Sequence, residues 1–70
     1  MLGMDYRLVD TLNADQLEPD DLIGLAGGVC KIISITPIKY GYALIFEDEY
    51  NEKDVIEIFD HEIFNLYVMD

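Results

Sequence analysis

The spacing of the apolar residues constrains the fold of this chain most, because they come in short runs that end at turn-forming residues. Alternation of apolar and polar residues over about four to eight positions is typical of a β-strand with one face in the core. The predicted strands cover residues 5–9, 22–25, 29–36, 42–49, 55–59 and 63–69. The chain is therefore expected to fold mainly as β-structure.

Turn-forming residues separate these runs. Asn13 can cap one helical turn that has Leu17 as its buried anchor. Pro19 ends that turn, because the residue before a proline is pushed out of the helical region. The other turns are expected at residues 26–28, 37–41, 50–54 and 60–62. Within them, Asn51 suits a left-handed position and Asp60 is expected to act as a cap.

The run at residues 29–36 is expected to be a central, strongly bent strand, since neither of its faces is polar throughout. Strict alternation places Ile32 and Ile35 on opposite faces of this strand. In the run at residues 55–59, the face that carries Ile56 and Ile58 is predicted to be the core face.

The expected architecture is a small antiparallel sheet of five or six strands with one or two short helical turns. It curls on itself or closes into an SH3-like barrel, because closure removes exposed strand edges. We expect a single domain over residues 1–70. The order of elements resembles small SH3-like barrels over residues 15–68, although Gly-Asp commonly stands in such barrels where this chain has Asp20 and Asp21. Asp20 is less free than glycine to adopt a positive φ.

The net charge of the chain is strongly negative. Fifteen Asp and Glu against four Lys and Arg give −11, while 51% of the residues are hydrophobic. Such a composition predicts a folded core under an acidic surface rather than a disordered acidic tail. Direct binding to nucleic acid is not expected, because the phosphate backbone would be repelled. The expected partner is positively charged.

The single cysteine, Cys30, excludes an internal disulfide and a Cys-based zinc site, and a buried, inert thiol is expected for it. Lone thiols suit a reducing compartment. The first residues show no basic segment followed by an apolar one, and no stretch approaches the ~18 apolar residues of a membrane span. We therefore expect a soluble cytoplasmic protein, with no membrane partner.

No catalytic or cofactor motif stands out in the chain. His61 lies between Asp60 and Glu62, which could suggest acid–base chemistry, but no hydroxyl or thiol nucleophile is nearby in sequence. The carboxylates lack the spacing of an EF-hand, and Gly27-Gly28 lacks the lysine and helix of a phosphate-binding loop. We expect no enzyme activity, no metal site and no cofactor.

The aromatic residues are expected to serve mainly core and rim packing. Five tyrosines and three phenylalanines could suggest a base-stacking face, but such a face also needs more than the four Lys and Arg available here. Tyr40, Tyr42 and Tyr50 are the rings expected at the surface.

The acidic residues gather in two segments. One spans residues 47–54, with five acids and one base in eight residues, and the other lies at residues 15–21. On a continuous strand, Glu47 and Glu49 would point to the same side about 6.5–7 Å apart. Phosphates follow one another at roughly 3.4 Å along each DNA strand. Carboxylates on neighbouring strands could thus present a DNA-binding protein with the charge pattern of a backbone.

In size, acidity and β-rich core, the chain resembles the small phage-encoded DNA mimics that inactivate host DNA-binding proteins, such as the acidic Bacillus-phage inhibitor of the nucleoid protein HU. The resemblance implies no catalysis, a location in the host cytoplasm, and binding to the basic DNA-binding surface of an HU-like protein. The expected contact residues are Glu47, Asp48, Glu49, Glu52, Asp54 and Glu57, with Asp15, Glu18, Asp20 and Asp21 as a second set. Tyr50 or Tyr42 could add apolar contact.

An alternative function remains open. The chain could be a small SH3-like protein-interaction module of a larger phage or translation-related assembly, in which an aromatic groove binds the partner and the acids serve solubility. A homodimer is also left open, because a core of this size supplies only about 3–5 kcal/mol of stability.

Overall fold

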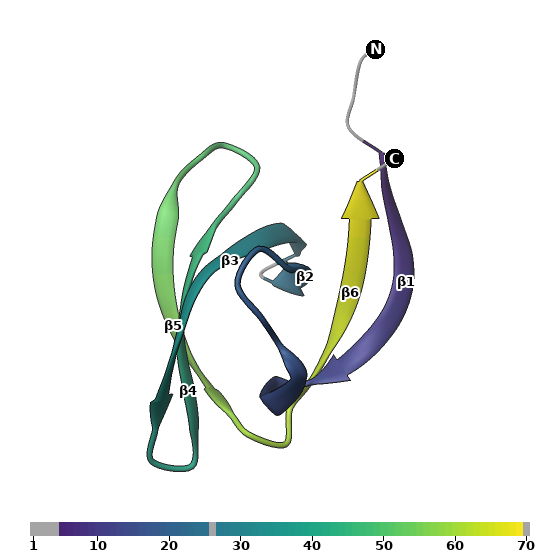
Figure 1. Cartoon of the computed structure of the whole chain (residues 1–70). Helices are drawn as coiled ribbons and strands as arrows, with labels where there is room; N and C mark the ends of the chain where they lie inside the picture. The colour runs from purple at the N-terminus through teal and green to yellow at the C-terminus, as the bar shows by residue number, and fades with distance from the viewer. Residues whose placement is uncertain (1–4, 26, 70) are drawn as a thin grey trace.

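Six antiparallel strands form one curled sheet in the computed structural model, which describes residues 5–25 and 27–69 (Figure 1). The elements are β1 (Tyr6–Asn13), the 3₁₀ turn η1 (Ala14–Gln16), β2 (Leu22–Leu25), β3 (Gly28–Ile38), β4 (Gly41–Glu47), β5 (Lys53–Phe59) and β6 (Ile63–Met69). The strand order is β1-β6-β2-β3-β4-β5, so β1 and β5 are the two edges. The predicted mainly β, curled antiparallel sheet is confirmed, and it does not close into a barrel.

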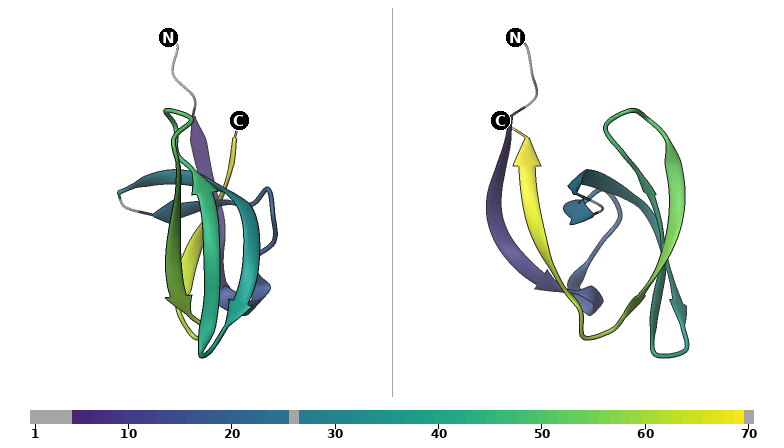
Figure 2. Two further views of the ribbon diagram at one scale, coloured as in Figure 1. Left: turned by 90° about the vertical axis from the view of Figure 1, so that its left-hand side faces the viewer. Right: turned by 180° about the vertical axis from the view of Figure 1, so that it is seen from behind.

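The curl brings two groups of strands to face each other across the core. Figures 1 and 2 show β1 and β6 on one side, β3, β4 and β5 on the other, and β2 between them. The buried core cluster consists of Ala14, Leu17, Ile23, Ile32, Leu44 and Ile58. Burial of Leu17 and Ile58 confirms two predicted core residues. Ile56 is still 38% exposed, because β5 has no strand on its outer side.

A bulge in β3 overturns the predicted assignment of its faces. Ile32 lies opposite Phe46 and Ser34 opposite Ile45, so Ile33 is an extra residue without a partner in β4. A bulge shifts the alternation by one residue and bends the strand. Ile32 and Ile35 therefore lie on the same face, and Ile35 packs against the core cluster. The central position of β3, between β2 and β4, is confirmed.

The connection predicted at residues 37–41 is much shorter in the structure. β3 continues through Pro37 to Ile38, and Ile38 lies opposite Gly41, so Lys39 and Tyr40 alone form the turn. Beyond Lys31, β3 pairs with β4 and no longer with β2. A proline is tolerated in a strand that is paired on one side only, where its missing N–H is not needed.

The turn predicted at residues 60–62, after β5, is present in the structure, but its capping residue is not the predicted one. Glu62 Oε2 accepts a hydrogen bond of 2.6 Å from the amide of Phe59, whereas Asp60 Oδ1 lies 3.5 Å from His61 Nδ1. The prediction of Asp60 as the cap was wrong, because a carboxylate three residues beyond the strand end reaches its last amide. Asn13 does precede η1 as predicted, and its amide donates to Gln16 Oε1.

Replacing Tyr40 with glycine is expected to stabilise the protein by about 0.5–1 kcal/mol. Tyr40 has a φ of 70°, a left-handed conformation that is unfavourable for a bulky side chain, and it is 70% exposed, so little packing is lost. The free energy of unfolding from urea denaturation measures the effect. Asn51→Gly is the control, because Asn51 also has a positive φ, 64°, but tolerates it better. A lower stability of Tyr40→Gly would contradict this account.

Candidate functional site

The loop between β4 and β5, at residues 48–52, is held in shape by the side chain of Asp48. Its Oδ1 accepts hydrogen bonds from the amides of Tyr50, at 2.8 Å, and Glu52, at 3.0 Å. Asn51 donates its amide to the carbonyl of Asp48 and adopts the left-handed conformation predicted for it. The carboxylate of Asp48 thus builds the loop, which presents its neighbours Glu49 and Glu52 at defined positions.

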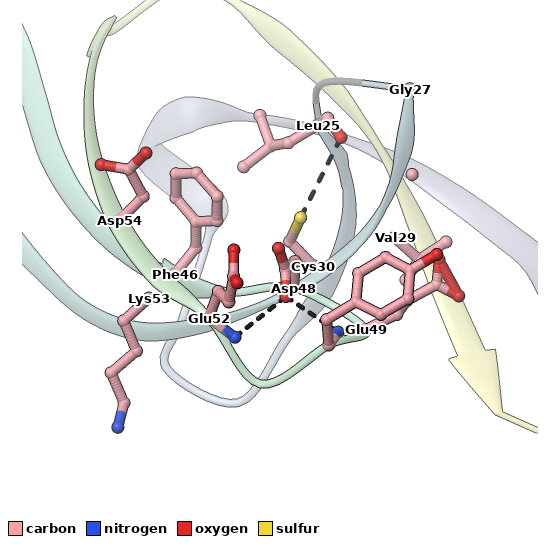
Figure 3. A pocket seen from close by; sticks show the side chains of 12 residues that line it. Leu25, Gly27, Val29, Cys30, Phe46, Asp48, Glu49, Glu52, Lys53 and Asp54 are labelled. Carbon is pink, nitrogen blue, oxygen red and sulfur yellow. Dashed lines mark hydrogen bonds between the residues drawn. The ribbon is translucent and has the colours of Figure 1, made fainter.

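This loop and residues 27–28 at the start of β3 enclose a hollow of about 410 Å³ at one end of the sheet (Figure 3). Its apolar lining includes Leu25, Val29, Cys30 and Phe46. Its acidic residues, which we call the acidic end, are Asp48, Glu49, Glu52 and Asp54. A Cβ on Gly28 would lie 3.6 Å from Glu49 Oε2, so the side chain of Glu49 reaches across to the β2–β3 turn.

Cys30 is buried beneath the acidic end. Its side chain is 4% exposed, and its Sγ lies 4.0 Å from the carbonyl oxygen of Leu25. Burial raises the pKa of the thiol above its ordinary value, and the negative charges of Asp48 and Glu49 raise it further. The thiolate is the reactive form of cysteine. The predicted burial is confirmed, and the surroundings of Cys30 disfavour a nucleophilic role.

Glu47 differs from the acidic end because lysines flank it. In the sheet it lies directly opposite Lys31 of β3 and Lys53 of β5. Side chains of directly opposed residues are about 4.5–5.5 Å apart at Cβ, close enough for opposite charges to attract. The predicted strand spacing between Glu47 and Glu49 does not apply, because β4 ends at Glu47 and Glu49 belongs to the loop.

Glu57 lies farther along the edge strand β5, opposite Ala43 of β4. It shares a face of β5 with Lys53 and Val55, whereas Asp54 lies on the opposite face of the strand. Glu57 does not line the hollow. The structure therefore brings four of the six residues of the first predicted contact set together at the acidic end, and leaves Glu47 and Glu57 outside it.

The second predicted contact set lies elsewhere. Asp15 belongs to η1, at the opposite end of the sheet from the 48–52 loop (Figure 1). The segment at residues 20–21 runs beside β3, where Asp20 donates its amide to the carbonyl of Ile32 and Asp21 accepts the amide of Ile32. Glu18 precedes that segment and donates its amide to Asp21 Oδ2. Strand β3 thus separates this set from the acidic end.

Asp20 adopts the left-handed conformation that the SH3-like pattern commonly assigns to glycine, with a φ of 75°. Aspartate visits this region more readily than most residues, because its short polar side chain can hydrogen-bond locally. The departure from Gly-Asp at this position therefore does not prevent the turn.

The predicted surface aromatic residues are confirmed for two of three positions. Tyr40 is 70% and Tyr50 84% exposed, and Tyr50 lines the hollow. Tyr42 was predicted to be exposed and is instead half-buried, because its strand position turns the ring toward the core cluster. Tyr50 is therefore the ring available for apolar contact beside the acidic end.

Sequence reasoning missed the hollow and its apolar lining, although one signal pointed to it. In four consecutive antiparallel strands joined by hairpins, the first and third turns lie at the same end of the sheet. The acidic run after β4 and the Gly27-Gly28 turn after β2 occupy these two turns. Applied to the predicted strands, the rule places them next to each other.

Comparisons with known proteins leave the site to be interpreted on its own geometry. No protein-family model, curated protein or solved structure matches this chain. Among residues 5–25 and 27–69, no three or more His, Cys, Asp or Glu side chains are grouped so that they could hold a metal ion. No helix in that part of the chain is long and apolar enough to cross a membrane.

Proposed function

We propose that this protein is a non-enzymatic acidic DNA mimic that binds the basic DNA-binding surface of a nucleoid protein of the HU type and blocks access of DNA to it. The observation that carries the proposal is the acidic end, where four carboxylates surround one hollow next to a well-braced loop. The net charge of −11 supports it, because a strong negative field accelerates encounter with a cationic groove.

The lining of the hollow suits lysine or arginine side chains. These residues have an apolar stem and a charged head, and they bury the stem while the head stays near polar groups. Leu25, Val29 and Phe46 would contact the stems, while Glu49 and Glu52 would pair with the heads. Tyr50 adds an exposed ring at the same place.

Within the acidic end, Glu49 and Glu52 are the residues most suited to partner contact. Both are exposed, whereas Asp48 builds the loop and Asp54 Oδ1 accepts the amide of Val55. Glu47, flanked by two lysines, presents less uncompensated charge. The second set at residues 15–21 could contact only a partner that also reaches past β3.

Replacing both Glu49 and Glu52 with lysine is expected to weaken binding to purified HU by about 100-fold or more, since charge pairs at an interface contribute several kcal/mol together. The control replaces Asp15 and Glu18 with lysine, which changes the net charge equally but leaves the acidic end intact. It should retain most of the affinity. Isothermal titration calorimetry measures both variants, and duplex DNA should displace the parent protein from HU.

Three results would contradict the assigned surface. The first is unchanged affinity of the Glu49/Glu52 variant, and the second is an equal loss in both variants, which would show that the acidic end contributes no more to binding than the acids at residues 15–18. The third is that the parent protein and duplex DNA bind HU simultaneously.

The apolar lining of the hollow also supports a second candidate function, a protein-interaction module of a phage or translation-related assembly. In that case Leu25, Val29 and Phe46 would dominate binding and the acids would serve solubility. Ionic strength separates the two functions, because salt screens exposed charge pairs far more than apolar contacts. Affinity that falls steeply with added NaCl favours the mimic, and affinity that hardly changes favours the module.

A further inference from the structure

Strand β5 is an edge of the sheet, and its pairing with β4 determines which backbone groups face outward (Figure 2). The amide of Asp48 donates to the carbonyl of Glu52, and the amide of Asp60 donates to the carbonyl of Tyr40. The register of β4 and β5 between these two bonded pairs is regular. Bonded and non-bonded pairs alternate in an antiparallel ladder. The even-numbered residues of β5 therefore bond to β4, while residues 53, 55, 57 and 59 turn their N–H and C=O groups to the open edge.

Two of these outward amides are occupied by carboxylates of the same chain. The amide of Val55 donates to Asp54 Oδ1 at 2.8 Å, and that of Phe59 donates to Glu62 Oε2 at 2.6 Å. Open edges present unpaired backbone groups to which another chain can pair. These two carboxylates reduce the number of donors that β5 offers.

The other edge shows the same arrangement. The amide of Ala14 donates to the carbonyl of Glu62, so in the regular part of the β1–β6 ladder Thr11 and Asn13 face outward. The amide of Thr11 donates to Asp10 Oδ1 at 2.8 Å, and that of Asn13 to Gln16 Oε1 at 2.9 Å. Side-chain oxygens thus occupy edge amides on both sides of the sheet.

The side chains of β5 favour pairing with another strand once its edge is accessible. Val55 is 60%, Phe59 59% and Ile56 38% exposed, so the edge strand presents apolar side chains to solvent. Exposed apolar edge strands are typical sites of strand-to-strand association. Of the four outward-facing amides of β5, those of Val55 and Phe59 are occupied by carboxylates, so the edge is only partly accessible.

The charges on β5 identify a second copy of this chain as the matching strand. In antiparallel pairing about Val55, each Lys53 lies opposite Glu57 of the other copy, and the residues that would hydrogen-bond across the pair, 53, 55 and 57, all have outward-facing backbone groups. Pairing about Ile56 would place Lys53 opposite Phe59, and pairing about Glu57 would place like charges together. Opposite charges across a strand pair are favourable and like charges are unfavourable.

We propose that the β5 edge is a self-association surface on which two copies pair antiparallel about Val55, and that the carboxylate of Asp54 keeps this edge closed. The amide of Val55 is the donor at the centre of that pairing. While Asp54 occupies it, the central hydrogen bonds of the dimer cannot form. Removal of the carboxylate makes the edge accessible and the dimer forms.

Sedimentation velocity on Asp54→Ala tests the proposal. The parent protein is expected to be monomeric and Asp54→Ala dimeric at the same protein concentration. Glu52→Ala is the matched control, because it removes one negative charge two residues away and uncovers no edge amide; it should stay monomeric. Circular dichroism shows that each variant is folded, and Asp54→Val, which removes the same acceptor in a residue that favours strands, replaces Asp54→Ala if the latter does not fold.

The register is tested in the Asp54→Ala background. Adding Lys53→Glu should abolish the dimer, because it places two Glu–Glu pairs across the strands, and adding Glu57→Lys to that variant should restore it. The proposal is overturned if the variants lacking Asp54 stay monomeric, if Glu52→Ala or the parent dimerises equally, or if Lys53→Glu leaves the dimer intact. None of these outcomes depends on HU binding.

Discussion

Gly41→Ala is expected to prevent folding of the chain. A Cβ on Gly41 would lie 1.8 Å from the carbonyl oxygen of Ile58 and 2.8 Å from its carbonyl carbon, and both are backbone atoms of the neighbouring strand. Backbone atoms in a paired strand cannot move aside without breaking the β4–β5 ladder, which starts at this residue. A core of this size supplies only about 3–5 kcal/mol of stability, less than the loss of this strand pair would remove.

The measurement compares circular dichroism and urea denaturation of Gly41→Ala with those of Gly24→Ala. Gly24 also lies in a strand, but the nearest atom to its added Cβ is Tyr67 Cε2 at 3.5 Å, an ordinary contact. Alanine is the better residue for a strand interior, so Gly24→Ala should be at least as stable as the parent. A folded Gly41→Ala with parent-like stability would refute the close approach between β4 and β5.

Leu44→Ala is expected to lower the free energy of unfolding by about 2–5 kcal/mol, close to the full stability of so small a domain. Leu44 is completely buried in the core cluster, where it belongs to β4 and lies opposite Ile35 and Ile56 on the neighbouring strands. Truncation removes buried apolar surface and leaves a cavity that cannot easily close, because β4 is held by paired strands on both sides.

Its control is Ile45→Ala, at the next position of the same strand. Ile45 is 41% exposed and points to the opposite face, so its truncation should cost much less. Urea denaturation of both variants gives the difference. Equal losses at positions 44 and 45 would show that the assignment of the two faces of β4 is wrong.

The local features of the fold were predictable because they depend on residues close together in sequence. Asn13 before η1 and the left-handed Asn51 follow from short-range hydrogen bonding and backbone preferences. The order of the six strands follows from alternation and β-forming residues, but the strand predicted at residues 5–9 was too short, because β1 continues to Asn13. The bulge at Ile33 was not predictable in this way, because an extra residue becomes visible only when the partner strand is known.

The candidate site was predictable only where its features depend on residues close together in sequence. The acidic run that contains Glu49 and Glu52 is visible in the sequence, and the loop predicted at residues 50–54 places Glu52 correctly, whereas Glu49 was predicted on the strand and lies in the loop. The lysines beside Glu47 come from two other strands, so only the register of β3, β4 and β5 reveals them. The apolar lining of the hollow likewise combines β2, β3 and β4.

The amino-acid sequence by itself determined the order of strands and turns, the excess of negative charge and the solitary thiol, because each is a property of composition or of near neighbours. The tertiary structure alone decided that the sheet stays open, which acids surround the hollow, and that Asp54 and Glu62 occupy edge amides. These depend on which strands pair and in what register, and pairing joins residues that are distant along the chain.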